Sequence, residues 1–138
     1  MKVEKAPDVQ FVLERIVRHL DLPHVNEYRL LCMRSFESKA RAYARIWSLP
    51  KIWQEALGIR AYYVIEVLSE NFDGLSDEEK EKTLIHELLH IPRTFSGALL
   101  PHEFKGRRID SRSVNALWKQ FKEREKKGAS AGAYQSTP

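Results

Sequence analysis

Two histidines and one glutamate occur within the short stretch HELLH, in which His86 and His90 are four residues apart and Glu87 follows the first. Four residues are about one turn of an α-helix, so imidazoles at this spacing point to the same side and can hold one divalent metal ion between them. Glu87 lies on the neighbouring edge of that face, where it can reach a water molecule at the metal. The motif therefore predicts two metal ligands and one general base.

A third ligand is needed, because a catalytic zinc site normally takes three protein ligands and leaves one position for water. His102 is the first candidate, since the segment 91–101 contains two prolines and a glycine that let the chain leave the helix and fold back. Glu103 is the alternative third ligand. With zinc held by the three histidines, we expect peptide-bond hydrolysis in which Glu87 takes a proton from water and later delivers it to the leaving amine.

Three other interpretations of this stretch stay open. In the first, the helix packs into the core through Leu84, Leu88 and Ile91, and the histidines are only hydrogen-bonded. In the second, the metal stabilises a binding module without turnover, and a fourth protein ligand completes its coordination. In the third, the protease associates with DNA through the basic stretches KGRR (105–108) and KQFKEREKK (119–127), which makes nucleic acid a candidate partner.

The helix that must carry the motif has the clearest start signal in the chain. An Asp-Gly pair favours a turn just before it, and Ser76 and Glu79 have the spacing of a capping box. Further acidic residues in the first turn suit the positive end of the helix dipole. Pro92 disfavours helical geometry at the residue before it, so we predict a helix over residues 77–91.

The other segments alternate between helical and extended patterns. Apolar residues at helical spacing predict a helix over 9–20 with Asp8 as its cap. Partial alternation within 25–47 favours two strands joined by a turn near Ser38. The remaining elements are a short helix from Pro50 to a stop at Gly58, a strand over 61–68, and a final helix whose apolar face carries Val114, Leu117, Trp118 and Phe121. Together they predict an α+β fold.

The strand over 61–68 is the candidate wall of a substrate cleft. It is dense in β-branched and aromatic residues, and its nearly continuous apolar character predicts coverage on both faces. An extended substrate can add to such a strand as a further strand of the sheet. Glu66 is an acid within this apolar run, and it either orients a ligand histidine or pairs with Arg41 or Arg45.

Length and composition are those of an ordinary globular protein. The 138 residues are 43% hydrophobic and 30% charged, and we expect one domain over 1–127 followed by a disordered tail over 128–138. Cys32 is the only cysteine, no apolar run could span a bilayer, and the first ten residues lack the apolar centre of a signal peptide. These features predict a cytoplasmic protein. The net charge of +4 permits nucleic-acid contact without requiring it.

The motif residues also resemble those of a known class of protein. His86, Glu87 and His90, with His102 after a loop and the sequence PHEF around it, are similar to a minimal zincin of the SprT-like type, the group that includes the Spartan DNA–protein crosslink proteases. More closely still, the segment from about residue 30 to 103, with its motif IHELLHIP, resembles a family of metallopeptidases found in archaea and phages. The resemblance implies a zincin-like fold, in which a small mixed or antiparallel sheet packs on the metal-binding helix with flanking helices. It also implies zinc and a peptide or protein substrate.

Overall fold

The structure is a computed structural model that describes residues 1–135, with side-chain surroundings given for residues 1–128. It combines a four-stranded sheet with helices and so confirms the α+β prediction. The elements in chain order are β1 (Lys2–Lys5), α1 (Pro7–His19), the 3₁₀ helix η1 (Glu27–Arg29), β2 (Leu30–Phe36), β3 (Ala44–Ser48), α2 (Lys51–Leu57), β4 (Tyr63–Leu68), α3 (Ser69–Phe72), α4 (Asp77–Leu88), β5 (Glu103–Phe104), β6 (Arg107–Arg108) and α5 (Ser111–Gln135).

The sheet is mixed, with the strand order β1-β2-β4-β3. β2 and β4 are parallel, whereas β1 pairs antiparallel with β2 and β3 pairs antiparallel with β4. The two strands predicted on either side of Ser38 are therefore present as β2 and β3, but they do not pair with each other because β4 lies between them. β1 was not predicted, because its sequence KVEK is exposed along its whole length and has no apolar alternation.

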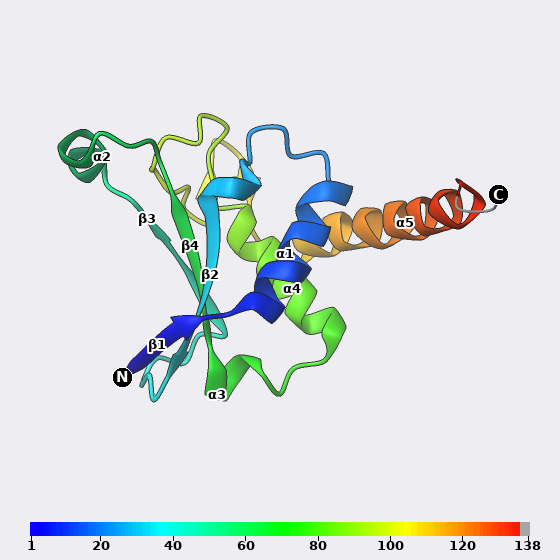
Figure 1. The fold of residues 1–138 in the computed structure, drawn as a ribbon, viewed down its shortest axis with the longest axis horizontal. Helices are drawn as coiled ribbons and strands as arrows, with labels where there is room; N and C mark the ends of the chain where they lie inside the picture. Colours follow the sequence, from blue (N-terminus) through cyan, green and yellow to red (C-terminus); the bar gives the residue numbers. More distant parts are fainter. Residues whose placement is uncertain (136–138) are drawn as a thin grey trace.

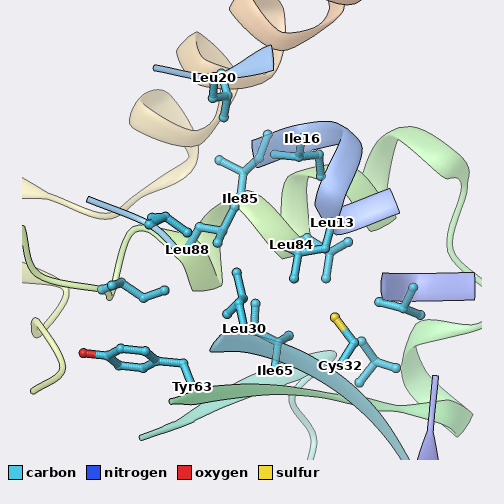
Figure 2. Packing of buried hydrophobic residues seen from close by; sticks show 14 of the residues in the cluster. Leu13, Ile16, Leu20, Leu30, Cys32, Tyr63, Ile65, Leu84, Ile85 and Leu88 are labelled. Atoms are coloured by element: carbon cyan, nitrogen blue, oxygen red, sulfur yellow. The ribbon is translucent and has the colours of Figure 1, made fainter. Parts of the chain in front are cut away.

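The core lies between one face of the sheet and the helices α1 and α4, which cover that face (Figure 1). β4 is the most buried strand, as predicted, and its residues Tyr63 and Ile65 belong to this core. Figure 2 shows how side chains from α1 and α4 meet those of the sheet, with Leu84 and Leu13 above Leu30 and Ile65. Burial of each such aliphatic side chain contributes about 1.5–3 kcal/mol, so this packing holds α4 in place.

α1 begins where the apolar pattern predicts, but Asp8 is not its cap. The N-cap residue is Ala6, and no side chain caps this helix end. The Asp8 carboxylate instead accepts two hydrogen bonds from Arg34 on β2, at 2.8 and 3.0 Å. The Arg34 guanidinium lowers the pKa of Asp8. The Asp8 carboxylate bonds to Arg34 rather than capping the helix, because the guanidinium is charged and binds a carboxylate through two parallel hydrogen bonds.

α4 starts as the sequence predicts and ends earlier. The Ser76 hydroxyl accepts a hydrogen bond from the Glu79 amide at 3.2 Å, as in a capping box. The regular helix stops at Leu88, three residues before the predicted end at Ile91. The amides of His90 and Ile91 each bond to the carbonyl three residues back, at 3.1 Å in both cases. This tightened last turn is a common way to finish a helix ahead of a proline such as Pro92.

The last helix runs past the domain end expected at residue 127. α5 continues to Gln135, and residues 136–138 of the tail expected over 128–138 lie outside the described residues, so the disordered tail stays a prediction. Three alanines in this stretch are strong helix formers, so the helix started upstream propagates through it. None of the helices within residues 1–135 has the combination of length and apolar character that a bilayer crossing requires.

Candidate metal centre

The three predicted ligand residues come together in space. One ring nitrogen from each of His86, His90 and His102 lies within 4.8 Å of those of the other two. The Nε2 atoms of His86 and His102 are 3.2 Å apart, although the residues are sixteen positions apart in the chain. His90 is buried, His86 is half-buried and His102 is exposed, so the cluster opens toward solvent on the side of His102.

The end of α4 sets the direction of two of these rings. His86 lies in the last regular turn of the helix, and His90 lies in the tightened turn that follows it. Both keep the one-turn spacing, and their ring centroids are 5.3 Å apart. Leu84, Ile85 and Leu88 anchor the same helix segment in the core, so the histidines project from a rigid support.

His90 is held by the backbone of the loop that leads to His102. Its Nδ1 atom lies 2.5 Å from the carbonyl oxygen of Leu100, and the Leu100 amide donates to the His90 carbonyl at 2.7 Å. A carbonyl only accepts hydrogen bonds, so Nδ1 carries a proton, and in a neutral ring Nε2 is then the nitrogen with the lone pair that a metal ion needs. Such a bond fixes both the tautomer and the ring direction of a metal-binding histidine. The sequence gives no signal for this role, because Leu100 acts through its main chain.

A small hairpin follows His102 and holds it from the other side. β5 and β6 pair antiparallel across a turn at Lys105 and Gly106, both of which have positive φ. The Ile109 amide extends the pairing by donating to the His102 carbonyl at 2.7 Å. Glu103, the alternative third ligand, is exposed on β5 and lies outside the three-histidine cluster, with its carboxylate 3.7 Å from Arg108.

Glu87 lies beside the cluster in a groove of about 450 Å³. The groove is bounded by Tyr43 and Ala44 at the start of β3, by α4, and by the first turns of α5. The Glu87 side chain is buried, and this burial raises its pKa to about 7. A carboxyl group with such a pKa can both accept and release a proton near neutral pH.

The same surroundings favour a neutral ring at His86. Burial is the main cause that lowers its pKa, and the neighbouring rings of His90 and His102 lower it further. An imidazole must be neutral to coordinate a metal ion. The electrostatics of the cluster therefore favour the form of the histidine that binds metal.

Several groove residues carry no signal in the sequence. Ser111, Val114 and Asn115 line the groove from α5, and Tyr43 and Ala44 line it from the start of β3. Their contribution depends on how α5 and β3 pack against α4, which no local pattern reveals.

Glu66 and β4 do not have the roles considered for them beside the metal. The Glu66 carboxylate accepts hydrogen bonds from Arg45 at 2.8 and 3.2 Å and from the indole of Trp47 at 2.7 Å. It is thus the strand acid paired with Arg45. β4 has β2 on one side and β3 on the other, so it has no free edge for a substrate strand. β3 is the edge strand next to the groove.

The burial of Glu87 predicts a pH-dependent cost in the metal-free protein. Because the pKa of Glu87 is raised from 4.5 to about 7, the folded protein binds the carboxyl proton more tightly than the unfolded chain does. The stability that this proton contributes is complete below pH 4.5 and is lost as the pH rises through 7. That difference in pKa corresponds to about 3 kcal/mol. We expect Glu87→Gln to be more stable than wild type at pH 8 by up to this amount, and the gap to close toward pH 5.

Urea unfolding in the presence of a chelator, followed by tryptophan fluorescence at both pH values, measures this difference. The histidines are present in both proteins, so the comparison isolates the effect of the Glu87 side chain. A stability difference that does not change with pH would contradict the assignment of a buried, protonated Glu87.

In this α+β domain a helix and a following loop bring three histidines together, and a buried carboxyl group lies beside them in a groove that His86 also lines. Metal-dependent hydrolases use such ligands together with such an acid–base group. The chain belongs to the family described as "putative phage metallopeptidase", which matches residues 1–122. This description suggests a metallopeptidase role. Comparison with curated proteins and with solved structures found no match.

Proposed function

We propose that this protein is a zinc-dependent endopeptidase, with His86, His90 and His102 as zinc ligands and Glu87 as general base and acid. The observation that carries the proposal is the three-histidine cluster with a buried glutamate directly beside it. A packed helix with incidental histidines would not require the third ring, from a separate loop, to meet the other two. The family description supports the same class of reaction.

The spacing of the nitrogens supports zinc as the metal. Two histidine nitrogens bound to tetrahedral zinc at 2.0–2.1 Å lie about 3.3 Å apart, and the Nε2 atoms of His86 and His102 are 3.2 Å apart. Three imidazoles without a carboxylate or a thiolate form a donor set typical of catalytic zinc. Glu103 lies outside the cluster, so the described residues offer no fourth ligand, which favours an enzyme over a purely structural site.

The chemistry divides between the metal and Glu87. Zinc bound by the three histidines would lower the pKa of a water molecule and polarise the substrate carbonyl. Glu87 takes the proton of the attacking water and gives it to the leaving amine nitrogen as the peptide bond breaks. Its raised pKa suits both steps, because the group must gain and lose one proton in each cycle. His90 keeps its ring direction through Leu100 during the reaction.

The free edge of β3 supports an extended polypeptide as substrate. β3 pairs with β4 along one side only, and no other strand within residues 1–135 pairs with its other side. The Tyr43 carbonyl accepts from the Leu68 amide of β4, and the Leu49 amide donates to Tyr62, just before β4. In an antiparallel pair the alternate residues, Ala44, Ile46 and Ser48, direct their backbone groups outward. Ala44 also lines the groove next to Glu87. A substrate strand on this edge would run past the catalytic residues.

Metal analysis combined with a hydrolysis assay tests this function. We expect protein purified without added metal to hold about one zinc per chain and to cleave an unfolded, alkylated protein at internal bonds, as shown by mass spectrometry. A chelator should stop cleavage, and one equivalent of zinc should restore it. Undiminished cleavage by protein shown to be free of metal would overturn the proposal.

A further inference from the structure

We infer that Tyr63 is a positioning residue for the metal centre: its hydroxyl group fixes the loop at Gly97 and Ala98, and the loop in turn orients His90 and places His102. The inference rests on the proposed function, since it assigns a role within the same site. Tyr63 belongs to the central strand β4 and reaches the loop from within the core.

The Tyr63 hydroxyl makes two hydrogen bonds, both to the backbone of this loop. It accepts from the Gly97 amide at 2.9 Å and donates to the Ala98 carbonyl at 2.8 Å. Its side chain has no exposed surface, and Figure 2 shows the ring at the margin of the apolar cluster with the oxygen pointing away from it. A phenylalanine would fill the same space, so packing of the core does not require the oxygen atom.

The loop connects the residues bound by Tyr63 directly to the two proposed metal ligands His90 and His102. Ala98 is two residues before Leu100, whose amide and carbonyl both bond to His90. His102 follows two residues later. A shift of the backbone at 97–98 would therefore move the carbonyl that holds the His90 ring, and it would move the attachment point of the third ligand at the same time.

Close packing around residues 95–97 restricts the conformation of the loop. The Tyr63 ring meets the ring of Phe95 edge to face, with centroids 4.9 Å apart. Gln54 of α2 donates to the Ser96 carbonyl at 3.0 Å. Gly97 has φ +98°, and a Cβ atom there would lie 2.4 Å from the Gln54 amide nitrogen and 2.6 Å from a backbone oxygen. The loop thus packs between α2 and Tyr63, and the two hydrogen bonds of the Tyr63 hydroxyl fix the position of the backbone at Gly97 and Ala98.

Removal of the Tyr63 oxygen tests the inference. We expect Tyr63→Phe to fold and to bind Co²⁺ about tenfold more weakly than wild type, at the low end of the 10–100-fold typical of groups that orient metal ligands. We also expect a changed visible absorption band of the Co²⁺ protein, because that band reports the geometry of the ligands. Affinity is measured by competition with a chromophoric chelator, with thermal unfolding as the check on folding.

Two control variants separate positioning from a general loss of stability. Tyr62→Phe removes the hydroxyl of the preceding, partly exposed tyrosine, and Ile16→Val weakens the core on α1, away from the loop. Both should bind Co²⁺ with wild-type affinity and spectrum. Gly97→Ala disturbs the same loop from its other side, at the contact with Gln54, and replaces no apolar side chain of the core, so it should weaken binding as Tyr63→Phe does. If both variants act on the same loop, the double variant should lose less Co²⁺ binding free energy than the sum of the losses in the two single variants.

The outcomes distinguish this inference from the proposed function. If wild type binds Co²⁺ and Tyr63→Phe binds it with the same affinity and spectrum, the inference is wrong and the metal site stands. If Tyr63→Phe does not fold, Gly97→Ala decides the matter, and wild-type binding by that variant overturns the inference. If wild type itself binds no Co²⁺, both the proposed site and the role of Tyr63 are lost.

Discussion

Glu87→Gln is expected to reduce the rate of peptide hydrolysis by about 10²–10⁴-fold, the range that a positioned acid–base group contributes. The amide keeps the size of the side chain in a buried position but cannot take a proton from water at neutral pH. The three histidines are untouched, so the variant should still bind zinc in the wild-type amount. At pH 7 and above it should also be at least as stable as wild type, because an amide carries no charge into the buried site.

The variant must be compared at equal zinc content, with turnover measured on the same unfolded substrate. Glu78→Gln is the matched control, since Glu78 is an exposed carboxylate on the same helix that pairs with Lys82. Loss of an exposed pair of this kind has little effect on stability, so Glu78→Gln should cleave at the wild-type rate. If Glu87→Gln with full zinc cleaves as fast as wild type, Glu87 is not the base.

His102→Ala is expected to reduce zinc affinity by more than the roughly 100-fold that loss of an outer orienting group can cause. This residue supplies one of three direct ligands, and the two that remain form an incomplete set for zinc. The purified variant should hold far less than one zinc per chain, and hydrolysis should fall with it. Added zinc should raise the thermal stability of wild type, because a ligand that binds only the folded state stabilises it, and the variant should lose this response.

His24→Ala is the control for the removal of an imidazole, since His24 lies outside the cluster. Metal content by mass spectrometry and affinity by chelator competition measure the difference between the two variants. Unchanged zinc affinity in His102→Ala would show that another residue is the third ligand. Glu103→Gln would then be tested next, although the position of Glu103 beside Arg108 predicts no effect.

The sequence by itself determined the features that depend on neighbouring residues. The capping box at Ser76 and Glu79, the one-turn spacing of His86 and His90, and the stop imposed by Pro92 all act over a few residues. A helix start and a helix face follow from local hydrogen bonds and from the helical period, so they can be predicted without knowing the fold. The position of Glu87 beside two ligands follows from the same period.

The tertiary structure alone decided how these local elements are combined. Strand order depends on which apolar faces can be buried together. Because β4 lies between β2 and β3, β3 is the edge strand at the end of the sheet opposite β1. The partner of Asp8 was a distant guanidinium rather than its own helix end, because such charges meet only after folding. His102 lies beside His86 of α4, and Tyr63 bonds to the loop between them. Both contacts join residues far apart in the chain, so neither follows from a local pattern.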